Sequence, residues 1–150
     1  MRIVVQRVSE SSVLINGEER RSIGKGLMVL VGFEESDTAD DITWMCKKIV
    51  QLRIFGDEEG KMNLSIADVN GEMLLISQFT LHASTVKGNR PSFIKAARPE
   101  TAIPLYEKMI AELNTLLNQK IQTGEFGADM KVSLINDGPV TIVIDSKQRE

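Results

Sequence analysis

The apolar run Met73-Leu74-Leu75-Ile76 leads directly into the polar stretch Ser77-Gln78-Phe79-Thr80-Leu81. Four consecutive apolar residues predict a strand that is buried in a sheet. Polar side chains that follow such a strand are held at a surface by a rigid element, which favours a functional site. The alternative interpretation is a strand end whose Ser and Thr hydroxyls hydrogen-bond nearby backbone groups. This stretch by itself leaves both interpretations open.

Runs of aliphatic and β-branched residues predict about seven or eight strands in the whole chain. The clearest of them cover residues 2–8, 11–15, 18–23, 27–31, 73–78, 131–135 and 140–144. Asn16-Gly17 is typical of a hairpin turn, because a type I′ turn needs positive φ at both central positions. Asn136-Asp137-Gly138-Pro139 predicts another hairpin turn, between the last two strands.

Apolar residues at helical spacing predict two long helices. The first follows Ser36 or Asp37, either of which can cap its N-terminus, and Cys46 lies on its apolar face. The second covers residues 101–119, with Pro104 in its first turn, where a missing N–H is tolerated. Because the strands come in runs, the expected fold is α/β in the broad sense, with mixed, mostly antiparallel sheets.

Composition predicts one soluble domain, residues 1–150, with 42% hydrophobic and 26% charged residues. A single cysteine excludes an intramolecular disulfide and fits a reducing compartment. No apolar run approaches the length of a membrane span, and the first strand is too short and too polar for a signal peptide. We therefore expect a cytoplasmic protein with no membrane partner.

Charge is unevenly distributed along the chain. The net charge of −3 argues against a general nucleic-acid coat. Between His82 and Pro99, however, there are four basic residues and no acidic one; they are Lys87, Arg90, Lys95 and Arg98. This segment is either a solvated loop or a phosphate contact that positions a nucleic-acid end.

The usual cofactor and metal motifs are not found. His82 is the only histidine, and Ser77 and Ser84 are too close to it in sequence for the usual arrangement of a catalytic triad. One His and one Cys do not make an ordinary zinc site, and Asp57-Glu58-Glu59 lacks the alternating ligands of a calcium loop. We expect no cofactor and no metal. A hydrolase of this composition would work through positioning, backbone donors, hydroxyls or the substrate itself.

Five short motifs, in order, resemble the D-aminoacyl-tRNA deacylase family over essentially the whole chain. They are Val5-Gln6-Arg7-Val8, Ser77-Gln78-Phe79-Thr80, Lys87-Gly88-Asn89-Arg90-Pro91, Phe126-Gly127-Ala128-Asp129-Met130 and Gly138-Pro139. The resemblance implies a deacylase-like fold with a barrel-like core and two long helices. It also implies a homodimer with its active site at the subunit interface, acting on D-aminoacyl-tRNA and glycyl-tRNA.

The resemblance also implies roles for the residues of this chain that match the family motifs. Ser77, Gln78, Phe79 and Thr80 are expected to line the pocket for the aminoacyl ester and the terminal adenosine. Phe126 and Met130 match the segment near the adenine, although ordinary apolar packing explains them equally well. In this family the Gly-Pro bond is cis. Its turn enters the partner's site, where backbone carbonyls exclude an L side chain.

One further residue role and the mechanism follow from the same resemblance. Arg7 matches an arginine that braces the Gly138-Pro139 turn, against the alternative of an ordinary surface arginine. The implied reaction is hydrolysis by water, with an oxyanion at the amides of Phe79 and Thr80. Thr80 as a covalent nucleophile is the rival mechanism. Two other functions stay open: a dimeric RNA-end binding module without catalysis, and a hydrolase of free D-amino acid esters.

Overall fold

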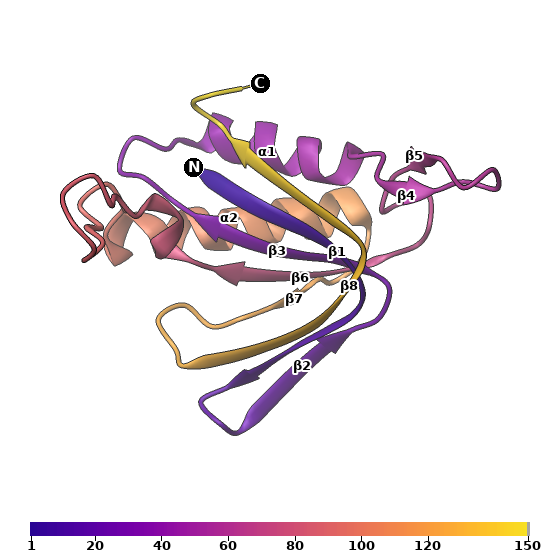
Figure 1. Cartoon of the computed structure of the whole chain (residues 1–150), viewed down its shortest axis with the longest axis horizontal. Coiled ribbons are helices and arrows are strands. Elements are labelled where there is room, and N and C mark those ends of the chain that lie inside the picture. The colour runs from indigo at the N-terminus through magenta and orange to yellow at the C-terminus, as the bar shows by residue number, and fades with distance from the viewer. Residues whose placement is uncertain (150) are drawn as a thin grey trace.

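The computed structural model describes residues 1–149. The strands of this part of the chain form a six-stranded sheet and a separate two-stranded ribbon, with two α-helices beside the larger sheet (Figure 1). The strands are β1 (Arg2–Ile15), β2 (Glu19–Ile23), β3 (Gly26–Gly32), β4 (Phe55–Gly56), β5 (Met62–Leu64), β6 (Glu72–Ser77), β7 (Gln122–Thr123) and β8 (Met130–Asp145). The helices are α1 (Ala39–Gln51), the 3₁₀ helix η1 (Phe79–His82) and α2 (Pro99–Leu117).

The long strand β1 organises the sheet because it pairs with three other strands. Its first half pairs with β3 and its second half with β2, while β8 follows its other edge, and all three pairings are antiparallel. β3 then pairs with β6, and β6 with β7, in parallel. Arg21 of β2 donates a hydrogen bond of 2.8 Å to the Thr123 carbonyl of β7, which links the two ends of the strand order.

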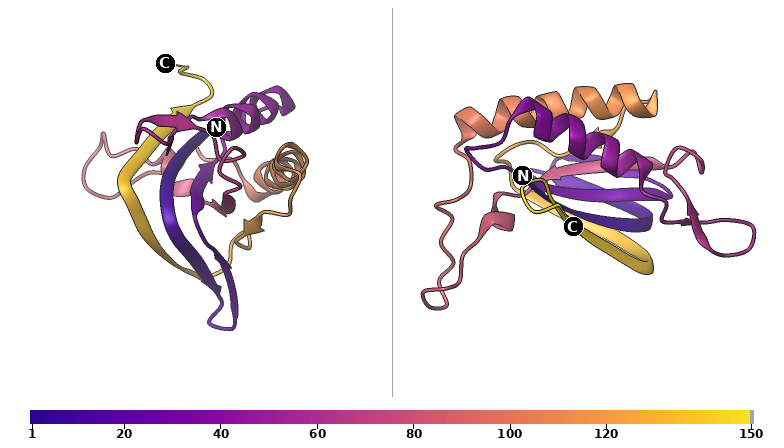
Figure 2. Two further views of the ribbon diagram at one scale, coloured as in Figure 1. Left: turned by 90° about the vertical axis from the view of Figure 1, so that its right-hand side faces the viewer. Right: turned by 90° about the horizontal axis from the view of Figure 1, so that it is seen from above.

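The resulting sheet is strongly curved and nearly closed, and both long helices lie on one side of it (Figure 2). The prediction of a mixed, mostly antiparallel α/β fold with a barrel-like core and two long helices is therefore confirmed. The main core lies between the helices and strands β1, β3 and β6. Strand β3 is buried along almost its whole length, as its apolar sequence predicts.

The Cys46 side chain lies in this core. Burial raises the pKa of its thiol to about 12, and the sulfur lies 3.9 Å from the Met109 carbonyl of α2. The thiol therefore keeps its proton near neutral pH and packs as a small apolar group. No helix in residues 1–149 is long and apolar enough to cross a membrane.

Four predicted strands are in fact two. Residues 2–15 form β1 without a break, and residues 130–145 form β8. The predicted hairpin turn at residues 136–139 is wrong, because both halves of β8 pair with β1 and the chain does not reverse. β1 is long enough to pair with both halves, so residues 137–140 are accommodated as a bulge opposite Arg7.

Both helix starts also differ from the prediction. The N-cap of α1 is Thr38, because the Asp41 carboxylate accepts hydrogen bonds from the Thr38 amide at 2.9 Å and hydroxyl at 3.1 Å. α2 begins at Pro99, which takes the first-turn position that was predicted for Pro104. Pro104 lies inside the helix. The carbonyl it leaves without its helical donor is that of Glu100, an exposed residue where water can take the donor's place.

Candidate active site

A pocket of about 320 Å³ lies where β6 ends. Its lining residues come from three separate parts of the chain: Leu30, Ile76, Ser77, Gln78, Phe79, Phe126, Gly127, Ala128, Met130 and Val132. The structure therefore brings the Ser77-Gln78-Phe79 stretch together with Phe126 and Met130, as the sequence comparison predicts. Leu30, Gly127, Ala128 and Val132 were not singled out from the sequence, because small and aliphatic residues have no pattern that separates a pocket wall from a core.

Strand pairing explains how these segments meet. β6 lies parallel to β3, and the Gln78 amide donates to the Val31 carbonyl at 2.7 Å, which keeps the chain beside β3 up to the start of η1. On the other side of β6, the Gly124 amide donates to the Leu75 carbonyl at 3.0 Å and starts the segment that carries Phe126. A Cβ on Gly124 would lie 2.5 Å from the Met130 sulfur. Glycine at this position therefore allows the segment to pack closely against Met130.

Phe126 also packs against Tyr106, with ring centroids 6.4 Å apart. The Tyr106 hydroxyl donates to the Leu75 carbonyl at 2.9 Å, and burial raises the pKa of this phenol. Phe126 thus lines the pocket and also contacts the core.

The chain turns into η1 immediately after the pocket strand. The first N–H groups of a helix have no partner within it. Among the hydrogen bonds of residues 1–149, none has the Phe79 or Thr80 amide as its donor. The Thr80 hydroxyl donates to the Gln78 side-chain oxygen at 2.6 Å, and Phe79 and Thr80 are both exposed. Two free amide donors and a hydroxyl therefore lie beside the pocket.

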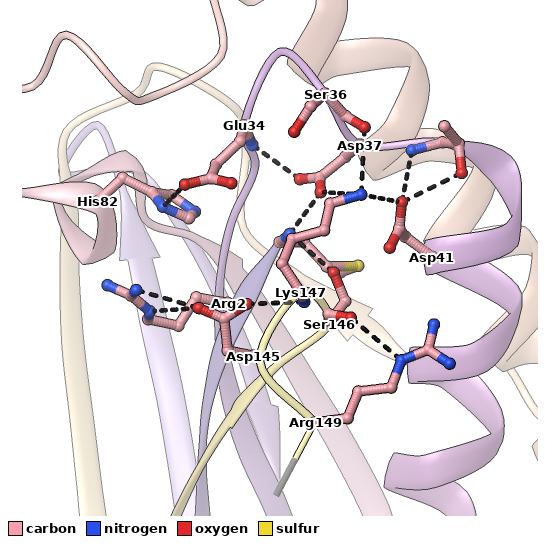
Figure 3. A network of polar contacts seen from close by, with 12 residues as sticks. Arg2, Glu34, Ser36, Asp37, Asp41, His82, Asp145, Ser146, Lys147 and Arg149 are labelled. Carbon is pink, nitrogen blue, oxygen red and sulfur yellow. Dashed lines mark hydrogen bonds and ion pairs between the residues drawn. The ribbon is translucent and has the colours of Figure 1, made fainter.

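A polar network holds η1 against the sheet (Figure 3). Arg2 of β1 donates to the Leu81 carbonyl at 2.7 Å and also pairs with Asp145 at 3.0 Å. The His82 Nδ1 lies 3.1 Å from a Glu34 carboxylate oxygen, and its Nε2 is buried without a partner in the described chain. The imidazole therefore faces Glu34 rather than a serine hydroxyl, and within residues 1–149 it forms no Ser-His pair of the triad type.

The same network continues to the chain ends. The Met1 ammonium pairs with the buried Asp37, and Lys147 lies 2.7 Å from Asp41. Burial acts to raise the pKa of Asp41, but hydrogen bonds from Lys147, Thr38 and Ser146 outweigh it and lower that pKa strongly. These charges stabilise the fold around α1 and do not reach the pocket.

Gly138 and Pro139 lie away from their own chain's pocket, in the exposed bulge of β8. The peptide bond between them is cis. Arg7 supports this bulge from inside: its side chain is 14% exposed, and it donates to the carbonyls of Asp137 (2.9 Å) and Ile54. A Cβ on Gly138 would lie 2.8 Å from the Arg7 guanidinium, so the two residues are in close contact. Arg7 is therefore more than an ordinary surface arginine.

Lys87 and Arg90 lie in the exposed loop between η1 and α2, which extends away from the body of the molecule (Figure 2). Within residues 1–149 neither side chain makes an ion pair. In the same part of the chain there is no group of three or more His, Cys, Asp or Glu side chains that could hold a metal ion. Asp57 instead accepts hydrogen bonds from the amides of Glu59 and Lys61 and closes its own turn.

A larger groove, of about 720 Å³, lies between α1 and the end of β8. It contains Trp44, with the charged groups of Lys48 and Arg149 at 5.7 and 4.2 Å from the ring centroid. The smaller pocket is the better candidate for chemistry, because free backbone donors and hydroxyls gather at its edge.

Comparisons with known proteins assign the chain to a family. The family model described as D-Tyr-tRNA(Tyr) deacylase matches residues 4–145. D-aminoacyl-tRNA deacylases of Bacteroides thetaiotaomicron and Flavobacterium johnsoniae are 64% and 59% identical, each over 150 residues and all of both chains. The family match and these relatives thus define a hydrolase of aminoacyl esters. The chain belongs to the D-Tyr-tRNA(Tyr) deacylase family, and its activity is that of a D-aminoacyl-tRNA deacylase.

Solved structures share the fold. A protein described as c-Myc DNA Unwinding Element Binding Protein superposes with a TM-score of 0.91 at 41% identity, covering 97% of this chain and 98% of its own. A probable eukaryotic D-amino acid tRNA deacylase superposes with a TM-score of 0.83 at 17% identity, covering 95% and 97%. The second likeness concerns the fold alone.

Proposed function

We propose that this enzyme hydrolyses the ester between a D-amino acid, or glycine, and the 3′ end of tRNA, as a chiral proofreading step that recycles mischarged tRNA. The observation that supports this most is the pair of free amides, Phe79 and Thr80, beside a pocket of about 320 Å³. Family membership supplies the substrate class. We place the reaction in the cytoplasm, with residues 1–150 acting as a single domain.

In the proposed mechanism, water attacks the ester carbonyl carbon. The carbonyl oxygen becomes an oxyanion that accepts hydrogen bonds from the Phe79 and Thr80 amides. The 2′-hydroxyl of the terminal adenosine helps to orient the water, since His82 and Cys46 are both buried and neither lines the pocket. Collapse of the tetrahedral intermediate breaks the ester C–O bond and returns a proton to the leaving 3′-oxygen. The products are the free amino acid and tRNA with a free 3′-hydroxyl.

Side chains at the pocket have separate roles in this proposal. Gln78 accepts the Thr80 hydrogen bond at 2.6 Å, so the two side chains hold each other in place. Ser77 contributes a hydroxyl to the wall. Phe126 and Met130 offer an apolar surface to the adenine. Thr80 acts through its backbone amide and through this hydrogen bond, and no covalent acyl-enzyme is formed.

Chiral selection requires a second subunit. The exposed bulge that carries Gly138 and Pro139 is remote from its own pocket but free to enter that of a partner. In a homodimer, the backbone carbonyls of this bulge face the substrate α-carbon. They exclude an L side chain by steric contact, because a backbone wall adapts poorly to an added group. Glycine, which has no side chain, passes this filter.

The basic loop is proposed to bind the tRNA backbone. Lys87 and Arg90 are exposed cations on an extended loop, and such groups position a nucleic acid through its phosphates without reading its sequence. The net charge of −3 confines favourable contact with RNA to this local region.

The decisive experiment is a paired deacylation assay of purified protein with D-Tyr-tRNA and L-Tyr-tRNA. The proposal expects rapid loss of the D ester while the L ester is spared. Hydrolysis of both esters would support the hydrolase activity but contradict the exclusion of L side chains by the carbonyls of the bulge. Saturable tRNA binding without turnover would indicate the RNA-end binding module. Turnover of free D-tyrosine esters at the same efficiency as D-Tyr-tRNA would indicate an esterase that makes no use of tRNA.

A further inference from the structure

Two phenylalanines form an exposed aromatic pair at the pocket edge. The ring centroids of Phe79 and Phe93 are 5.0 Å apart with an interplanar angle of 75°. Phe79 is 53% exposed and Phe93 is 36% exposed. Phe79 lines the pocket, whereas Phe93 belongs to the loop between η1 and α2, so the pair extends the pocket wall outward. Aromatic surface left open beside a pocket is characteristic of a binding surface.

The loop that carries Phe93 has charges of one sign. The loop residues Lys87, Arg90 and Lys95 are all exposed, and none of them makes an ion pair within residues 1–149. Residues 83–98 contain no acidic side chain. Exposed aromatic rings beside unpaired cations are the combination that recognises single-stranded nucleic acid, where bases stack on the rings and phosphates meet the cations.

We propose that Phe93, together with Phe79, stacks the base of the nucleotide immediately 5′ to the terminal adenosine of the substrate. This inference rests on the proposed function, which places the terminal adenosine and its ester in the pocket. A single strand whose last nucleoside occupies that pocket must leave it across the edge. The Phe79–Phe93 pair forms part of this edge, and the cations of the loop follow it. Phe93 is thus assigned to substrate binding, outside the chemistry of ester hydrolysis.

A substrate series tests this assignment. D-Tyrosyl esters of adenosine, of the dinucleotide cytidylyl-adenosine and of whole tRNA are compared for kcat and KM in the wild type, Phe93→Ala, Phe93→Trp and Ile94→Ala. Stacking on one base predicts that the dinucleotide ester exceeds the adenosine ester in kcat/KM by about fivefold or more in the wild type. Phe93→Ala should abolish this gain through a higher KM, with kcat retained, and Phe93→Trp should keep it.

Ile94→Ala is the matched control, because Ile94 is the next residue in the loop, is 92% exposed and carries no aromatic ring. It should leave the gain unchanged. A dinucleotide ester whose first nucleotide lacks its base should show no gain in kcat/KM over the adenosine ester in the wild type. Phe93→Ala should not lower kcat/KM for this abasic ester any further.

The outcomes separate the two proposals. If the wild type hydrolyses none of the D esters, the proposed function itself fails. In a second outcome, the wild type hydrolyses all of them while Phe93→Ala lowers kcat for the adenosine ester as much as for the longer esters. In that case Phe93 merely supports Phe79, and the stacking inference is overturned. An equal loss on all substrates that accompanies a change in oligomeric state overturns it too, because Phe93 would then belong to a subunit contact.

Discussion

Replacing Arg7 with lysine tests how the β8 bulge is held. The Arg7 guanidinium donates to two carbonyls, Asp137 at 2.9 Å and Ile54, and lies 3.6 Å from the Asp137 carboxylate. Lysine keeps the charge but cannot reach both carbonyls in the same planar geometry. Losing one hydrogen bond from a charged donor whose side chain is only 14% exposed costs about 1.5–3 kcal/mol. For a chain of this size, that loss lowers Tm by about 3–12 °C.

The same loss of free energy should weaken chiral selection. If the lost hydrogen bond normally holds the bulge in the position that excludes an L side chain, the preference for D-Tyr-tRNA over L-Tyr-tRNA falls by about 10- to 100-fold. Thermal unfolding and the paired deacylation assay measure the two effects on one preparation. Arg20→Lys is the control, because Arg20 is exposed and donates to Ser12 at 2.9 Å from a neighbouring strand. An Arg7→Lys protein with reduced Tm and undiminished chiral preference would refute the link between bulge support and selection. An unchanged Tm would refute the support itself.

Three other predictions concern catalysis, acid stability and RNA binding. Thr80→Ala should stay within about tenfold of wild-type kcat, because water is the nucleophile; a fall on the order of 10⁶ would establish Thr80 as a covalent nucleophile. Asp41→Asn should lower the free energy of unfolding by about 1–2 kcal/mol at pH 7, since it removes the carboxylate that completes the capping box of Thr38 and pairs with Lys147. The pKa of Asp41 is lowered in the folded state, so its contribution is fully present above its unfolded pKa of about 3.9 and is lost progressively as the pH falls from there through the lowered folded pKa. Urea unfolding should therefore show a smaller difference between the wild type and the variant at pH 3 than at pH 7, and a constant difference would contradict this. Lys87→Ala should reduce the slope of log K against log salt for tRNA binding by about 0.7–0.9, whereas Lys61→Ala, on the β4–β5 turn, should leave it unchanged.

Local patterns predicted most of the individual elements. The apolar run at residues 73–76 is the buried strand β6, and helical spacing placed Cys46 in the core. The errors occur where a distant partner decides the outcome. Residues 136–139 have the composition of a hairpin turn, yet β8 continues because β1 offers pairing partners on both sides of the bulge. Pro104 was placed in the first turn of α2, although Pro99 already occupies it.

The sequence predicted several residues of the candidate site but not the surface that they form together. The Ser77-Gln78-Phe79-Thr80 motif indicated polar groups at a strand end, and the structure adds the two free amides of η1 that follow from a 3₁₀ turn. Phe93 was missed, although an aromatic residue within a basic, acid-free segment is a signal for nucleic-acid binding.

By itself, the sequence determined the alternation of buried and exposed positions, the family motifs and the chemistry left open by one His and one Cys. These properties depend on residue type and short spacing, which the order of residues already contains. The family resemblance indicated that Phe126 and Met130 belong with the end of β6 and that Arg7 braces the Gly138-Pro139 turn. Only the tertiary structure decided the strand pairing that brings these residues there. Both arrangements depend on which strands pair and in what register, and that choice is made by the whole sheet when its apolar faces are buried together.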